Sequence, residues 1–299
     1  MVAKGDTKSP FNYLAFAGVI NVILNIFLVT VLRLGVAGVA IATIVSQYIS
    51  AILTTRKLVK TEGDFHLDLS KLRIDLKVTK NIVRIGLPTG LQSAIMSLSG
   101  VFAQGAINTL GTDIVAGQSA ANSIWSFVAQ SINAFSQGCM TFVSQNYSAG
   151  KLNRVQKTFR YTIMIDLVLG IVLGVAVIGA GRLLLSVYTP DSAIAIEAGM
   201  IHFSATMFFA FLLGFQDASC FVLRGLNYSV FPMITSLFGN CLFRIAWVLL
   251  VFNHFAPGME NLEAYRLLVS SYPISWLIIF AANMVAYAVI MKKQKQIYG

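Results

Sequence analysis

A stripe of polar side chains runs along residues 118 to 137, where the surrounding sequence is apolar. Its members follow at steps of four, four, four, three and four residues, so an α-helix places them all on one face. A polar group inside an apolar helix needs a hydrogen-bonding partner or water. We therefore expect this face to line a water-filled cavity; amides that join neighbouring helices are the alternative, which explains isolated residues better than a stripe. The stripe consists of Gln118, Asn122, Ser126, Gln130, Asn133 and Gln137, and Gln104 and Asn108 on the preceding segment extend the expected cavity lining.

Two charged side chains, Asp217 and Arg244, lie deep in apolar segments of the second half of the chain. A buried ion is costly unless it is paired, so each requires the other as its partner or a polar cavity. In one interpretation the carboxylate of Asp217 changes its protonation or cation occupancy during function. In the other, the two residues form a static ion pair. Asp166 lies nearer the end of its segment. Three further amides in apolar segments are interpreted as packing residues, namely Asn21, Asn25 and Asn240.

The sequence lacks the residue patterns of known catalytic sites. Its three histidines are far apart, so there is no paired-histidine metal motif, and no Walker glycine loop is present to bind ATP. The serines lack the sequence context of a nucleophile elbow. We therefore predict no enzyme activity, no cofactor and no metal site. The cysteines lack metal-ligand spacing and are expected to pack in apolar segments; they are Cys139, Cys220 and Cys241.

The composition is that of a protein in lipid. Hydrophobic residues make up 57% of the 299 residues and charged residues 11%, whereas about 25% charged residues is typical of soluble domains. We expect an all-α integral membrane protein, because a backbone in lipid must satisfy its own hydrogen bonds. A helix needs about 20 apolar residues to cross the hydrocarbon core. About eight such spans are predicted, near residues 11–32, 34–55, 85–112, 114–150, 161–181, 198–222, 226–252 and 267–291.

The basic residues alternate between the segments that join these spans. Eighteen of the 22 Lys and Arg fall on one side, three fall on the other, and Arg244 lies within a span. The positive-inside rule makes the basic side cytoplasmic. It places both termini and the 56–84 connection in the cytoplasm of a multi-pass protein of the cell membrane. The charges are scattered over short connections, so the lipid bilayer is the expected partner and nucleic acid is not.

The end of the chain resembles its beginning. The segments that lead to Pro10 and to Pro232 align without a gap at an offset of 222 residues, and residues 46–50 resemble residues 271–275 at an offset of 225. Chance similarity between two apolar hairpins is the alternative. We interpret the hairpins as copies, so that one whole repeat follows the tail of another. Internal repeats are typical of membrane transporters.

Five short motifs follow one another along the chain: GDTKSP at 5–10, GVAGVAIAT at 35–43 with SQ at 46–47, GLP at 86–88, QNYSAG at 145–150 and LRG at 223–225. Each motif is weak by itself, but their order is specific. In this order they resemble the multidrug and toxic compound extrusion (MATE) family over essentially the whole chain.

The resemblance implies a twelve-span secondary antiporter with two six-span lobes, which exports cationic or amphipathic small molecules in exchange for protons or sodium ions. This chain begins at the position of the loop before the family's fifth span, so the first four spans are expected to be missing. We assign residues 1–57 to the last two helices of an incomplete N-terminal lobe and 58–83 to a cytoplasmic amphipathic linker. Residues 84–292 are assigned to a six-helix C-terminal lobe and 293–299 to a cytoplasmic tail.

Two alternatives to the antiporter remain open. One is a lipid-linked precursor flippase of the same superfamily, whose cavity usually holds more basic residues. The other is a transport-inactive fragment that needs a missing four-span partner. The family that the chain resembles also includes members with an acidic residue in the seventh span. Residues 86–96 correspond to that position here and contain no acidic residue. Asp217 is then the best remaining candidate for coupling to the ion.

Overall fold

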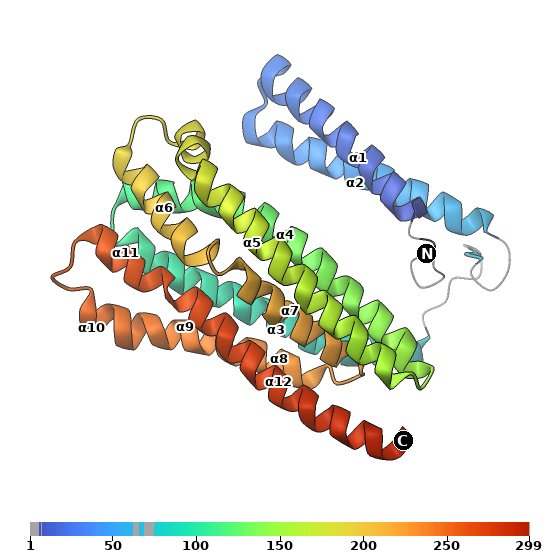
Figure 1. Ribbon diagram of the computed structural model, residues 1–299. Coiled ribbons are helices and arrows are strands. Elements are labelled where there is room, and N and C mark those ends of the chain that lie inside the picture. Colours follow the sequence, from blue (N-terminus) through green and yellow to red (C-terminus); the bar gives the residue numbers. More distant parts are fainter. Residues whose placement is uncertain (1–5, 7, 62–65, 69–74, 299) are drawn as a thin grey trace. The chain divides into compact units, whose positions relative to one another are not determined.

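The chain forms two compact units, residues 1–82 and 83–299, in the computed structural model (Figure 1). The structure describes residues 6, 8–61, 66–68 and 75–298. Every regular element in these ranges is a helix, which confirms the predicted all-α fold. The predicted 58–83 linker lies partly outside the described residues. Of the rest, α2 extends into it as far as Lys60, and α3 begins at Leu76.

The smaller unit is a helical hairpin. α1 (Lys8–Ile26) continues as a π-helical segment, η2 (Phe27–Val31), and α2 (Gly35–Lys60) returns beside them. Gly38 of α2 faces the backbone of Leu28, and a Cβ at Gly38 would lie 3.2 Å from the Leu28 carbonyl oxygen. The missing side chain therefore allows the two helices of the hairpin to approach closely.

The larger unit is built around α4. It begins with three long helices, α3 (Leu76–Asn108), α4 (Thr112–Ser148) and α5 (Leu152–Tyr188), and Figure 1 shows α4 and α5 side by side. Gly111 precedes α4 and Gly150 follows it, with φ values of +105° and +69°. Side chains with a Cβ rarely adopt such angles, so glycine at these positions allows the chain to reverse between helices.

The next span is broken in the middle. α6 (Ala193–Thr206) and α7 (Ala210–Gly225) are bent by 46° at residues 207–209. Two glycines of α5 pack directly against this break: Gly170 against the backbone of Phe211, and Gly174 against the carbonyl of Met207. A Cβ at either position would overlap these backbone atoms. The two glycines therefore allow the broken span to lie against α5.

The last two spans form a second hairpin. The first of them comprises α8 (Val230–Leu237), η4 (Phe238–Leu242), α9 (Phe243–Ala246), η5 (Trp247–Phe252) and α10 (Asn253–Phe255), and the second comprises α11 (Asn261–Val269) and α12 (Ser271–Tyr298).

The two hairpins share local features. Pro232 is the third residue of α8, as Pro10 is the third residue of α1. The first span of each hairpin contains a π-helical segment. When the two sequences are aligned with the offset of 222 residues, η2 corresponds to part of η5. These agreements support the interpretation of the hairpins as copies.

The predicted count of eight spans is not confirmed. Within the described residues, five helices are long and apolar enough to cross a membrane, and α6 with α7 makes a sixth when the bent pair counts as one. α3 and α4 are long enough but are not among these six, and the polar stripe lowers the hydropathy of α4. Large apolar side chains cover the outside of the spans; Val175 and Leu183 of α5 are examples. Apolar surface of this extent suits contact with lipid.

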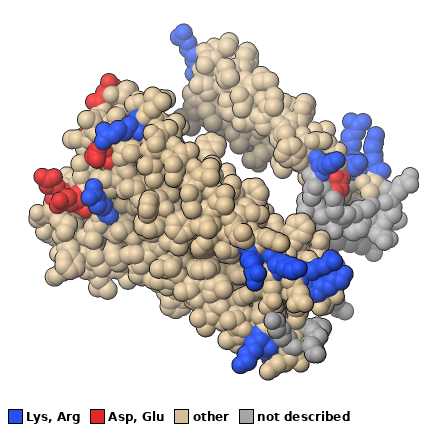
Figure 2. Space-filling view, in the orientation of Figure 1, with Lys and Arg blue, Asp and Glu red and all other residues tan. Residues whose placement is uncertain are grey.

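The exposed charged side chains of the larger unit gather at its two ends. Figure 2 shows Lys and Arg together at one end, and acidic side chains mixed with a few basic ones at the opposite end. The connection from α4 to α5 and the first turns of α5 contribute to the basic end. At the mixed end, Arg182 forms an exposed ion pair with Glu197 at 3.1 Å.

Candidate functional site

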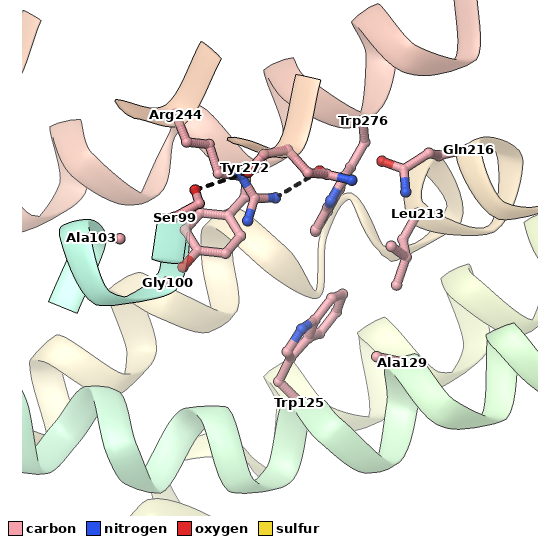
Figure 3. Close-up of a pocket in the computed structure, with 11 residues that line it drawn as sticks. Ser99, Gly100, Ala103, Trp125, Ala129, Leu213, Gln216, Arg244, Tyr272 and Trp276 are labelled. Atoms are coloured by element: carbon pink, nitrogen blue, oxygen red, sulfur yellow. Dashed lines mark hydrogen bonds between the residues drawn. The ribbon is translucent and has the colours of Figure 1, made fainter. Parts of the chain in front are cut away.

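The larger unit contains a partly open cavity of about 300 Å³ between α3, α4, α7, the η4–α9 segment and α12 (Figure 3). Its wall combines small residues of α3, aromatic rings of α4 and α12, and polar side chains of α7, η4 and α9. The lining residues are Ser99, Gly100, Ala103, Trp125, Ala129, Leu213, Gln216, Asn240, Arg244, Tyr272 and Trp276.

Arg244 places a positive charge at the wall of this cavity. Its Nη2 donates hydrogen bonds to Asn240 Oδ1 at 3.3 Å and to Ser275 Oγ at 3.1 Å. The guanidinium carbon lies 4.1 Å from the centre of the Tyr272 ring. A cation over an aromatic face is stabilised by about 0.5–2 kcal/mol. These neutral partners hold the guanidinium in place without cancelling its charge.

The backbone around Arg244 departs from α-helical geometry. The short helix α9 lies between the π-helical segments η4 and η5, and π-helical turns occur frequently at functional sites. Ser99 of α3 donates a hydrogen bond to the carbonyl oxygen of Asn240 at 3.1 Å. From the sequence we interpret Asn240 as a packing residue. In the structure it lines the cavity and accepts a hydrogen bond from Arg244.

Aromatic rings form the apolar part of the wall. Trp125 of α4 and Trp276 of α12 point toward one another in Figure 3, with ring centroids 5.5 Å apart and an angle of 14° between the ring planes. Tyr272 meets Trp276 edge to face at 6.3 Å. Because Trp125 and Trp276 are 9% and 2% exposed, the stacked pair closes this part of the wall.

Gln216 joins the cavity to the carboxylate of Asp217. Its side chain is 5% exposed, and its Nε2 lies 3.3 Å from Asp217 Oδ1, to which it donates a hydrogen bond. Its Oε1 is buried and accepts no hydrogen bond from any residue that the structure describes. A buried acceptor without a partner costs about 1–3 kcal/mol.

Asp217 connects α7 to the polar stripe of α4. Its Oδ2 accepts a hydrogen bond from Asn133 Nδ2 at 2.9 Å. The structure does not show the alternative of a static ion pair with Arg244: among the described residues, Asp217 bonds to Asn133 and Gln216, and Arg244 has the separate partners given above. The interpretation of Asp217 as the residue that couples to an ion stays a prediction.

The structure separates the other predicted site residues. Gln118 is buried, whereas Asn122, Gln130 and Gln137 are exposed on the larger unit, and Gln104 donates a hydrogen bond to Asn108 at 3.0 Å along α3. None of the eight residues predicted to line a cavity, Ser126 included, belongs to the wall of the cavity of Figure 3. Their contact with a substrate stays a prediction.

The amides of the first span act between helices. Asn25 Nδ2 donates to Asn21 Oδ1 at 3.0 Å, and Asn21 Nδ2 donates to Ser46 Oγ of α2 at 3.2 Å. This chain of hydrogen bonds joins the two helices of the hairpin, in agreement with the packing interpretation.

Asp166 is a buried acid that the sequence did not single out as a site residue. It is fully buried in α5, and its Oδ2 accepts a hydrogen bond from Ser136 Oγ of α4 at 2.9 Å. Its Oδ1 has no partner among the described residues. Gly214 of α7 packs on its Cβ. Asp166 and Asp217 therefore both contact α4, from two different helices.

A helical bundle with apolar outer surfaces is typical of an integral membrane protein. The MatE family model matches residues 88–250, more than half of the chain. The chain therefore belongs to the MatE family, as the order of its motifs predicted.

Curated relatives are similar along most of the chain. The probable multidrug resistance protein YoeA of Bacillus subtilis (strain 168) is 22% identical over 98% of this chain, and the probable multidrug resistance protein NorM of Thermotoga maritima is 22% identical over 85%. The chain covers 63% and 55% of these relatives, which is less than two thirds of either length.

Solved structures agree with the fold. An inward-facing multidrug resistance MATE family transporter of the MOP superfamily matches 97% of this chain with a TM-score of 0.77 and 16% identity. A MATE structure in the straight conformation matches 94% with a TM-score of 0.79 and 16% identity. The chain covers 66% and 62% of these two proteins. At this identity the likeness concerns the fold.

Proposed function

We propose that the protein with this chain exports cationic or amphipathic small molecules in exchange for protons or sodium ions. Membership of the MatE family supports transport, and the names of the relatives from B. subtilis and T. maritima support multidrug efflux. The structural observation that carries the proposal is the contact between two neighbouring residues of α7. Gln216 lines the cavity, and its amide bonds to the Asp217 carboxylate.

This contact provides a physical route from ion binding to the cavity. A proton or a cation on Asp217 occupies an oxygen that otherwise accepts a hydrogen bond, so the bonds from Asn133 and Gln216 must rearrange. Gln216 would transmit the change to a molecule in the cavity. α7 also begins at the break after α6, where a helix end can absorb a change of angle. Exchange requires that ion and substrate favour different conformations.

Efflux of ethidium, an amphipathic cation, tests this function. Loaded cells that express the chain are compared with vector cells at matched membrane protein level. Because the chain spans less than two thirds of its relatives, a second arm co-expresses a four-span N-terminal segment of a relative. We expect faster ethidium loss in at least one arm, and we expect that loss to stop when the proton and sodium gradients are collapsed.

Two results would contradict the proposal. Ethidium loss equal to that of vector cells in both arms would exclude efflux of this cation, and loss that continues without either gradient would exclude ion exchange. Activity restricted to the co-expression arm would favour the alternative in which the chain requires a separate segment.

We also propose that the protein lies in the cell membrane with both termini in the cytoplasm. The alternation of Lys and Arg along the chain supports this orientation. On intact cells, a membrane-impermeant maleimide is expected to label Glu260→Cys and not Lys151→Cys; both native side chains are exposed. Background labelling should be low because Cys139, Cys220 and Cys241 are buried. Reversed labelling would overturn the orientation.

A further inference from the structure

The positive charge of Arg244 has no counter-ion in the part of the chain that the structure describes. Its partners there are the Asn240 carbonyl group, the Ser275 hydroxyl group and the Tyr272 ring, all neutral. A guanidinium group carries five N–H donors. Nε and Nη2 donate to these partners, and Nη1 donates no hydrogen bond to a described residue. No described residue therefore takes up the charge or these two donors at the cavity wall.

A second, independent feature of the same cavity also lacks a partner. Gln216 is more than nine-tenths buried and lines the cavity, and its Oε1 accepts no hydrogen bond within the described residues. Figure 3 shows this amide at the edge of the cavity, with its oxygen on the side of Trp276. Buried polar atoms are normally satisfied, but an ionised carboxylate or phosphate brings no donor to this acceptor, so the Gln216 oxygen does not itself select an anion.

We propose that this cavity binds an amphipathic organic anion, with its carboxylate or phosphate group at Arg244 and its apolar body along Trp125 and Trp276. The proposal goes beyond the proposed function, because it assigns an anion to this cavity whereas the ethidium test concerns a cation, and it rests on that function only for the statement that the bound molecule is exported. Binding itself does not depend on transport.

The chemistry of the wall selects for charge and shape. A guanidinium group matches the geometry of carboxylate and phosphate oxygens, and a hydrogen bond between opposite charges is stronger than one between neutral groups. A cation at the same place would be repelled by Arg244. The rings of Trp125 and Trp276 stack on one another, with the two residues 9% and 2% exposed, and form the closed apolar part of the wall. A volume of about 300 Å³ is at the lower end of the range for small-molecule sites, which suits a body of one or two fused rings.

Three naphthalene derivatives with the same ring system test the proposal. The binding of 2-naphthoate, 2-naphthylmethylammonium and 2-naphthalenemethanol to the purified full chain in dodecyl maltoside micelles is measured by equilibrium dialysis, with protein-free micelles as the blank. We expect the anion to bind at least about tenfold more tightly than the cation, which is the affinity ratio of a single strong polar contact. Arg244→Gln should remove this preference and leave the affinity for the neutral alcohol unchanged.

Arg182→Gln is the matched control. It removes the same charge from an exposed residue whose partner is Glu197, outside the cavity, and it should leave all three affinities unchanged. A folded Arg244→Gln protein that binds naphthoate as tightly as wild type would overturn the proposal. So would a wild-type protein that binds the cation as tightly as the anion, and this comparison remains decisive if Arg244→Gln does not fold.

The same assay distinguishes two sources of the anionic group. Addition of phosphatidylglycerol to the micelles should displace naphthoate if an acidic lipid headgroup occupies the site, and it should have no effect if the site takes free anions. Either result is compatible with an anion site. Because dialysis measures binding alone, failure of ethidium efflux and failure of naphthoate binding are separate outcomes that test separate proposals.

Discussion

Asp217→Asn is expected to reduce ion-driven export at least about tenfold while substrate binding remains measurable, because the carboxylate is the group proposed to bind the ion. The substitution keeps the size of the side chain and its ability to accept a hydrogen bond from Asn133. It also adds an N–H donor. Gln216 can rotate its amide and accept this donor with Oε1, the atom that lacks a partner in the structure. The fold should therefore tolerate the change, and efflux under an imposed gradient measures the loss.

Asp113→Asn is the control for the loss of one carboxylate. Asp113 lies at the start of α4, is exposed, and accepts a hydrogen bond from Ser192 Oγ at 2.8 Å. Asp113 lies outside the wall of the cavity, so Asp113→Asn should leave export unchanged. Wild-type export by the Asp217→Asn protein, at equal membrane level, would reduce Asp217 to a structural partner of Asn133 and Gln216.

Composition is sufficient to predict that the elements of this fold are helices. Long apolar segments predict helices, because a backbone in lipid must satisfy its own hydrogen bonds. The order of the short motifs predicts the family. The bend at residues 207–209 is harder to predict. No proline marks it, and the glycines that accommodate it lie on α5, about 35 residues earlier in the chain. Contacts between distant segments set such features, and one sequence does not reveal the pairing.

The candidate site was predicted in part, for a similar reason. A charge in an apolar span is conspicuous, so Asp217 and Arg244 could be chosen from the sequence, but their partners could not. Helical spacing identifies the polar face of α4, yet Trp125 on the same helix has no feature that distinguishes it from other apolar residues. The cavity depends on Trp125 meeting Trp276 across 151 positions of sequence. Asp166 lies nearer the end of its segment, and that position does not reveal that the side chain is fully buried against α4.

Gly174→Ala is expected to destabilise the larger unit by about 1–3 kcal/mol, the usual cost of overpacking in a close-packed interior. The added Cβ would overlap the carbonyl of Met207, which is backbone and cannot move aside as a flexible side chain can. The substitution should push the break between α6 and α7 away from α5. Thermal unfolding in detergent, followed by tryptophan fluorescence, measures the lowered stability.

Gly179→Ala is the control on the same helix. Gly179 is exposed, and a Cβ added there meets no atom within 4 Å. Alanine is the better helix former by about 1 kcal/mol, so this variant should be as stable as wild type or more stable. The opposite signs of the two variants would show that close packing at the break, rather than helix propensity, explains the glycine at position 174. If Gly174→Ala unfolds at the wild-type temperature, α5 and the break are separated in the folded protein by more than the structure indicates, and α7 is free to move without displacing α5.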